Sequence, residues 1–236
     1  LSYLIQYSEK PIVITGSQKS ICLENTDARL NLYNSFLYAA AEGSHGVSLV
    51  FDGKVILGTR ARKERTKSFN AFSSIDYPET AMFRDRRLIQ FLQRPAEYTH
   101  AVFSTALDPN VFVLRLVPGM RADIIPLLEG RYRALVLESF GVGGLPGGDD
   151  GAMFAAVRDW CGAGHLAVFT TQVPHEGSDL AVYEVGRAAK ALPGVLEAHD
   201  MTPEATAVKL MWVLGQTTDR AEAEKLFLTP VQWDIL

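Results

Sequence analysis

The chain has 236 residues, 47% of them hydrophobic and 21% charged, and its formal net charge is −4. This composition is typical of a globular protein, and the length suits one large domain or two modest ones, each able to bury a core. The negative total excludes a general polyanion-binding protein, and no apolar run approaches the roughly 20 residues needed to cross a bilayer.

The first eleven residues predict the end of a helix. Leu1, Leu4 and Ile5 recur at helical spacing, and residues 8–11 end the pattern. An apolar helix face needs a surface to pack on, and the chain does not begin with methionine. We therefore expect further residues before Leu1 and an N-terminal domain that is incomplete in these 236 residues.

The segments that follow predict a strand, a helix and a second strand. "PIVIT" (11–15) is a continuous apolar run, as in a strand buried on both faces. Residues 26–43 predict a helix with Thr26 or Asp27 as N-cap. Its expected inward stripe is Leu30, Tyr33, Leu37 and Ala40. "VSLVF" (47–51) and "KVIL" (54–57) predict two strands joined by a tight turn, and the βαβ order places the protein in the α/β class.

A second α/β unit is predicted after the periodicity fades. The expected domains are 1–95 and 111–236, joined by a linker at 96–110. Strands are expected at 111–117, 134–139 and 167–171, and helices near 121–129, 151–162, 181–192 and 203–215. Thr202 is the expected N-cap of the last helix, with Pro203 in its first turn, and Thr218-Asp219 predicts a further helix start. We expect two Rossmann-like domains with mainly parallel sheets.

Small and amide-bearing residues follow three of these strands. Gly16-Ser17-Gln18 follows "PIVIT", "FGVGGLPGGDDG" follows "ALVLES", and "QVPHEG" follows "AVFTT". Turns favour such residues in any case. Open parallel sheets, however, bind ligands at the carboxyl ends of their strands. Together the three ends favour a site for a polar small molecule.

These segments resemble the asparaginase family, in particular its cytoplasmic type I branch. The motifs that carry the resemblance are "KPIVITGSQ", "TDARLNLYNSFLYAA", "GVSLVFDGKVILGTRARKERTKSFNAFSS", "LESFGVGGLP" and "DMTPEATAVKLMWVLGQ". The resemblance implies hydrolysis of L-asparagine to L-aspartate and ammonia by a threonine nucleophile, with a Thr-Lys-Asp relay and no cofactor. It also implies a cytoplasmic homodimer or homotetramer with active sites near subunit interfaces, closed by the loop 172–179.

On this resemblance Lys63 is the expected catalytic lysine. It lies in a segment with five basic side chains between Arg60 and Lys67. An ordinary lysine amine is protonated at neutral pH, so a relay needs desolvation or a neighbouring cation to lower its pKa. The basic flank and the aromatic residues after it could supply both. A solvated lysine in a charged run is the alternative, and a nucleic-acid patch is not expected.

Two further residues are expected to contact the substrate. Ser17 aligns with a substrate-contacting position of the family, and Gln18 is its neighbour. Each could instead only form a turn. Thr26-Asp27 resembles the catalytic Thr-Asp pair of the family, but its context matches a structural helix start, so we interpret it as a cap. His175 and Glu176 could face a partner subunit's substrate, although plain surface exposure is the favoured interpretation.

The family's T-G-G-T and H-G-T-D-T motifs do not occur in these 236 residues. We therefore expect the nucleophilic threonine and the relay aspartate to lie upstream, and these residues alone to be close to inert. Two alternatives stay open: an asparaginase-like glutaminase subunit of a tRNA-dependent amidotransferase, and a homologue that has lost catalysis. Cys22 and Cys161 form no metal-binding pattern, so no metal is expected, and both are predicted to be buried reduced thiols.

Overall fold

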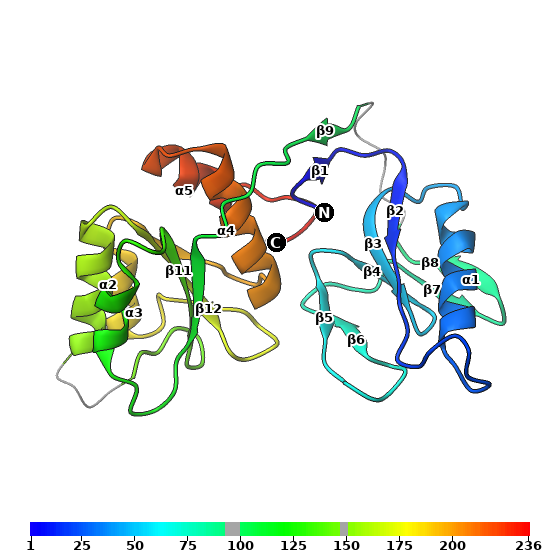
Figure 1. Ribbon diagram of the computed structural model, residues 1–236, viewed down its shortest axis with the longest axis horizontal. Coiled ribbons are helices and arrows are strands. Elements are labelled where there is room, and N and C mark those ends of the chain that lie inside the picture. The colour runs from blue at the N-terminus through cyan, green and yellow to red at the C-terminus, as the bar shows by residue number, and fades with distance from the viewer. Residues whose placement is uncertain (93–99, 147–150) are drawn as a thin grey trace. The chain divides into compact units, whose positions relative to one another are not determined.

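The computed structural model describes residues 1–92, 100–146 and 151–236 and divides into two units (Figure 1). Unit 1 contains Leu1–Thr105 and Val231–Trp233, and unit 2 contains Ala106–Pro230 and Asp234–Leu236. Residues 96–99 of the expected linker lie outside the described residues. None of the described helices is both long and apolar enough to span a membrane.

Unit 1 is built on a five-stranded mixed sheet with the order β2-β3-β4-β7-β8. Its strands are β2 (Pro11–Ile14), β3 (Gly46–Phe51), β4 (Lys54–Leu57), β7 (Ala81–Arg84) and β8 (Arg87–Gln90). In this sheet β2 and β3 are parallel, and they are joined through α1 (Ala28–Ala39), which confirms the βαβ unit. The other pairs are antiparallel. The expectation of a mainly parallel sheet is therefore wrong for this unit, because a two-residue turn at 52–53 joins β3 to β4 and another at 85–86 joins β7 to β8.

The start of unit 1 differs from the expected helix. The amide of Ile5 bonds to the carbonyl of Leu1 in one helical turn. The chain then becomes β1 (Ile5–Gln6), which pairs antiparallel with β9 (Val102–Phe103). Long-range pairing therefore ends the turn before a helix can form. The strand β2 is as expected, but it lies at the end of the sheet order and leaves Ile14 exposed, so it is not buried on both faces.

Helix α1 packs on β2 and β3 (Figure 1). The side of the helix that is buried differs from the one expected, although Leu37 of the expected stripe is half-buried. Its buried residues are Asn31, Asn34, Ser35 and Tyr38. The expected inward residues Leu30 and Tyr33 are exposed. Hydrogen bonds of Asn31 explain why this side of the helix faces the sheet. The Asn31 side chain donates to the carbonyl of Gly16 at 2.9 Å and accepts from the amide of Asp52 at 2.9 Å. These bonds hold the polar side of the helix against the strand ends.

A small antiparallel ribbon completes unit 1. It consists of β5 (Ala61–Lys63) and β6 (Phe72–Ser74), with Lys63 opposite Phe72. Phe72 packs against Phe51 of β3, with ring centroids 5.1 Å apart. The ribbon thereby fixes Lys63, at the end of β5, relative to the main sheet.

Unit 2 contains a fully parallel sheet with the order β10-β11-β12-β13. Its strands are β10 (Val111–Arg115), β11 (Ala134–Ser139), β12 (Leu166–Thr171) and β13 (Val195–Glu197). Its helices are α2 (Ala152–Gly162), α3 (Glu184–Lys190), α4 (Pro203–Gln216) and α5 (Arg220–Leu228). Trp160 and Phe169 are among the side chains buried in its core. The prediction of a Rossmann-like domain with a parallel sheet is confirmed for unit 2.

Capping residues in the sequence correctly predicted where α4 and α5 of unit 2 begin. Thr202 caps α4 by accepting from the amide of Ala205 at 3.1 Å, and Asp219 caps α5 by accepting from Glu222 at 2.8 Å. The prediction of one helix at residues 121–129 is wrong. Two short 3₁₀ helices, η1 (Ala122–Ile124) and η2 (Pro126–Leu128), occupy the segment because Pro126 lacks the amide that would continue one helix.

Candidate functional site

The candidate site lies in unit 1, where the chain leaves β2 through Gly16, Ser17 and Gln18. The buried carboxylate of Asp27 organises this turn by accepting hydrogen bonds from the amides of Gln18 (2.9 and 3.1 Å) and Lys19 (3.0 Å). Asn31 adds a bond to the Gly16 carbonyl. The first turns of α1 therefore hold the backbone after β2 in a defined shape.

The Asp27 carboxylate is held in its ionised form. Its burial by itself would raise its pKa, but the bonds from the amides of Gln18 and Lys19 and from the side chain of Asn31 outweigh this and lower the pKa below the ordinary value. The Asp27 side chain makes no capping bond to α1. Its interpretation as a helix cap is therefore incomplete, because the carboxylate instead orders the turn that carries Ser17.

Lys63 lies beside this turn. Its amine donates to the side-chain oxygen of Gln18 at 3.1 Å and lies 5.7 Å from the centre of the Phe72 ring. The side chain is exposed among the described residues. The aromatic neighbour that the sequence suggested is present, but the described residues do not bury Lys63.

The side chain of Gln18 connects β2 to the basic segment. Its amide nitrogen donates to the carbonyls of Arg65 (3.1 Å) and Ser68 (3.0 Å), while its oxygen accepts from Lys63. Both ends of the amide are therefore engaged within the protein. This arrangement suits a residue that orients Lys63 and the following loop.

The hydroxyl of Ser17 is available to a ligand. The Ser17 side chain is exposed, and no described residue forms a hydrogen bond with its hydroxyl. Its neighbours in the turn are held by Asp27 and Asn31, so the hydroxyl is presented on a rigid backbone. Ser17 can therefore donate a hydrogen bond to a ligand or accept one from it without first breaking a bond within the protein.

The second and third strand ends of the sequence prediction lie in unit 2, and their polar groups are used internally. Gln172 donates to the carbonyls of Leu116 (2.6 Å) and Glu138 (2.8 Å). The hydroxyl of Ser139 donates to Thr170. These hydrogen bonds join the ends of neighbouring strands, so Gln172 and Ser139 stabilise the fold of unit 2. Residues 147–150 of the glycine-rich segment lie outside the described residues.

Hydrogen bonds anchor the loop 172–179 at its C-terminal end. Ser178 donates its amide to His199, and Leu180 donates its amide to the buried carboxylate of Glu197 at 2.7 Å. His175 and Glu176 are exposed within this chain. Glu176 and Gly177 both have positive φ, of 75° and 66°, so the tip has a sharp turn.

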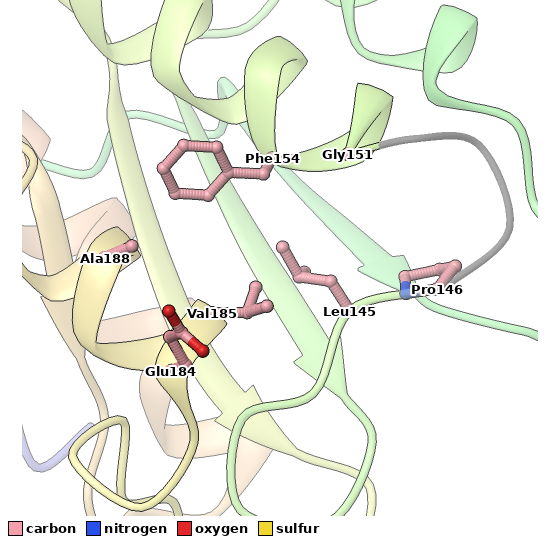
Figure 2. A pocket seen from close by; sticks show the side chains of 7 residues that line it. All are labelled: Leu145, Pro146, Gly151, Phe154, Glu184, Val185 and Ala188. Atoms are coloured by element: carbon pink, nitrogen blue, oxygen red, sulfur yellow. The ribbon is translucent and has the colours of Figure 1, made fainter.

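Figure 2 shows a pocket of about 420 Å³ in unit 2. Its lining is Leu145, Pro146, Gly151, Phe154, Glu184, Val185 and Ala188. Only one of these side chains is charged, and it lies at the start of α3. Amide chemistry needs several converging polar groups, so this pocket is not the candidate site. Among the described residues no cluster of three or more His, Cys, Asp or Glu side chains could hold a metal ion.

Sequence reasoning missed the roles of Asp27 and Asn31. A signal was available: residues 27, 31, 34, 35 and 38 are all polar and recur at helical spacing. An apolar stripe lies beside this polar one and dominates the helical pattern. The two cysteines also differ, because Cys22 is exposed, contrary to expectation, whereas Cys161 is buried.

Two family models cover most of the chain. A model described as "Asparaginase, N-terminal" matches residues 1–97, and one described as "Glutaminase/Asparaginase C-terminal domain" matches residues 110–227. An L-asparaginase of Thermococcus kodakarensis is 38% identical over 227 residues, which are 96% of this chain and 68% of that protein. The structure of a thermostable L-asparaginase from the same organism superposes with a TM-score of 0.93 at 35% identity, covering 100% of this chain and 70% of the other.

A second group of relatives has a different name. A glutamyl-tRNA(Gln) amidotransferase component from Metallosphaera sedula is 32% identical over 242 residues. The alignment covers 97% of this chain and 54% of that protein. The chain therefore spans about half the length of the amidotransferase relatives.

Proposed function

This chain belongs to the glutaminase/asparaginase family, and on that premise we propose that the protein hydrolyses the side-chain amide of L-asparagine to L-aspartate and ammonia. The observation that carries the proposal is the grouping of Ser17, Gln18 and Lys63 at the carboxyl end of β2. Similarity to L-asparaginases along both domains supports the choice of substrate.

In the proposed reaction Lys63 is the proton carrier of a Thr-Lys-Asp relay. Its amine makes one hydrogen bond to the described residues, to Gln18, so its remaining positions can face a nucleophile. A threonine hydroxyl must lose its proton to attack the amide carbon. The ammonia that leaves must gain a proton, and the same amine can return it.

The threonine and aspartate of this relay are proposed to come from outside the 236 residues, since neither T-G-G-T nor H-G-T-D-T occurs within them. We propose Ser17 as the residue that contacts the substrate and Gln18 as one that supports it through Lys63. No cofactor or metal takes part in this scheme. A cytoplasmic homo-oligomer with the loop 172–179 near the site completes the proposal.

The test measures ammonia release by the complete protein. Wild type is expected to release ammonia from L-asparagine, and Lys63→Met to lower kcat by about 10²–10⁴-fold, the usual contribution of a proton-transfer group. Lys67→Met is the matched control, because it removes the same charge from an exposed position in the same segment. Near-normal turnover by Lys63→Met would remove Lys63 from the mechanism.

A second candidate is a glutaminase that supplies ammonia to a tRNA-dependent amidotransferase. The observation that favours it is the 32% identity to the amidotransferase component along 97% of the chain. Ammonia release from glutamine that appears only with a partner protein and tRNA would select this candidate. An inactive homologue would release ammonia in neither assay.

A further inference from the structure

Arg60 differs from the other basic residues of its segment because its side chain is fully buried. Its exposed fraction is 0%, whereas Lys63 and Arg65 are exposed. Burying a charged group away from water is costly unless hydrogen bonds hold it. The Nε of Arg60 donates to the carbonyl of Trp233, and the guanidinium lies 5.7 Å from the centre of the Tyr77 ring. These contacts tie the residue just before β5 to a segment near the C-terminal end of the chain.

That segment, Val231–Trp233, belongs to unit 1 and is bound there at two consecutive carbonyls. The hydroxyl of the buried Thr59 donates to the Gln232 carbonyl at 2.8 Å, and Arg60 donates to the next carbonyl along the chain. In each bond 173 residues separate the two partners. Gln232 and Trp233 have φ of 47° and 61°, a conformation that is unfavourable for residues other than glycine and persists where neighbouring contacts hold it. The segment is therefore held in one shape against Thr59 and Arg60.

The strand β5 depends on such contacts because it is short and has one neighbouring strand. With β6 it forms a two-stranded sheet that no further strand extends among the described residues. A ribbon of two strands is only marginally stable by itself in water. The amide of Ile75, which follows β6, donates to the carbonyl of Arg60 at 3.0 Å. The backbone of Arg60 thus closes the ribbon while its side chain anchors it.

Lys63 lies at the other end of the same strand. The strand has three residues, so about 10 Å of extended backbone separates Lys63 from Arg60. The Lys63 amine donates to Gln18 at 3.1 Å. A proton carrier must lie within about 2.6–3.2 Å of the group that it serves, and a misplacement of about 1 Å can slow a reaction by about 10²-fold. A shift at the start of β5 would therefore reach the amine through very little intervening chain.

We propose that Arg60 is a positioning residue for Lys63. Its buried guanidinium binds the Trp233 carbonyl, fixes the start of β5 and so keeps the Lys63 amine beside the turn that follows β2. This inference rests on the proposed role of Lys63 in the reaction. Arginine suits the task because its planar group donates in a fixed direction while it lies over an aromatic ring, here that of Tyr77. A lysine at this position would not reproduce both contacts.

The first experiment measures amide hydrogen exchange in the complete protein and does not depend on activity. In Arg60→Met the amides of the ribbon, at residues 61–63 and 72–74, should exchange at least about tenfold faster than in wild type, while those of β3 keep their wild-type rates. Lys67→Met is the matched control, because it removes a basic charge from an exposed position of the same segment and should leave the ribbon unchanged. Wild-type exchange of the ribbon in Arg60→Met overturns the proposal.

A milder variant keeps the proposal testable if Arg60→Met does not fold. Thr59→Val removes only the hydroxyl that bonds to the Gln232 carbonyl. Loss of one such bond should speed exchange in the ribbon by about fivefold, again without a change in β3. A folded Thr59→Val with wild-type exchange in the ribbon overturns the proposal.

The second experiment measures kcat and KM for ammonia release from L-asparagine. Arg60→Met should lower kcat by about 10–100-fold and change KM by less than about threefold. In a Lys63→Met background the same substitution should lower kcat by less than about twofold, because Arg60 acts through Lys63. Equal losses in both backgrounds would show a purely structural role and overturn the proposal. Val55→Ala, which removes packing from the buried core at β4, is the stability control and should keep the wild-type kcat.

The kinetic results separate failure of this inference from failure of the proposed function. Near-normal turnover by Lys63→Met overturns the proposed relay, and the positioning role of Arg60 with it. An impaired Lys63→Met beside a normal Arg60→Met overturns the role of Arg60 alone.

Discussion

The amine of Lys63 donates a hydrogen bond to the side-chain oxygen of Gln18 at 3.1 Å, although 45 residues separate the two in the chain. The bond joins the end of β5 to the end of β2. It brings a residue from the basic segment to the turn that presents Ser17, so two motifs that were separate in the sequence form one group.

Gln18 is expected to act by positioning Lys63. Gln18→Leu removes the bond to Lys63 and the two bonds to the carbonyls of Arg65 and Ser68, so the amine and the loop lose their shared anchor. We expect kcat for ammonia release to fall by about 10–100-fold, with a smaller change in KM. Gln90→Leu, which removes one bond to the Glu42 carbonyl in the same unit, is the control. A change in KM alone would show that Gln18 binds substrate directly.

Asp27 should make stability depend on pH. Its folded-state pKa is lowered, so its contribution is fully present above the unfolded value near 3.9 and is lost as pH falls through the folded value. Asp27→Asn should cost about 1–3 kcal/mol of unfolding free energy at pH 7, because hydrogen bonds to a charged acceptor are lost. The difference in unfolding free energy between Asp27→Asn and wild type should become smaller below about pH 4.

Chemical denaturation of both proteins at pH 7 and pH 3.5 checks this expectation. The pKa of Asp108 is also lowered, because the Asn110 amide and Arg133 outweigh the effect of its burial. Asp108 is present in both proteins, so its contribution cancels. A difference that stays constant from pH 7 to pH 3.5 would show that the charge of Asp27 plays no part.

Lys209 and Asp234 form a fully buried ion pair in unit 2. The amine lies 2.8 Å from the carboxylate and donates to the Thr229 carbonyl at 2.8 Å. Burial lowers the pKa of Lys209, and Asp234 opposes that effect. Asp234→Asn should destabilise the protein by about 3–5 kcal/mol, because Lys209 keeps its buried charge without the counter-charge.

A double-mutant cycle isolates this pair. Lys209→Met should cost less in the Asp234→Asn background than in wild type, by at least about 1 kcal/mol. Unfolding free energies of the four proteins supply the measurement. Purely additive costs would mean that the two charges do not stabilise one another.

The two thiols should differ in reactivity. Cys22 is exposed, whereas Cys161 is buried and its pKa is raised by that burial to about 11. A thiol reagent at pH 8 should modify one cysteine per chain in the native protein and the second only after unfolding. Cys22→Ser should abolish the fast reaction, and rapid modification of two thiols in the native protein would contradict the burial of Cys161.

Several parts of the fold could be predicted from the sequence because their causes are local. Thr202 with Pro203 marked the start of α4, and Asp219 marked the start of α5, since a capping side chain acts on amides within three residues. The asparaginase family could be identified because its motifs preserve local spacing along both units.

Other features depended on contacts between distant segments. The inward side of α1 was set by the bonds of Asn31 to Gly16 and Asp52, and the helical turn at Leu1 ended because Ile5 pairs with Phe103. Hydrophobic periodicity reports which residues share a side of a helix, but it does not report which side meets the sheet. The sequence by itself determined the family of this protein and the elements whose signals are local, such as α4, α5 and the strands β10, β11 and β12. Only the tertiary structure decided that Lys63, Gln18 and Ser17 form one group and that α1 presents its apolar side outward, because hydrogen bonds across 15 to 45 residues hold those arrangements.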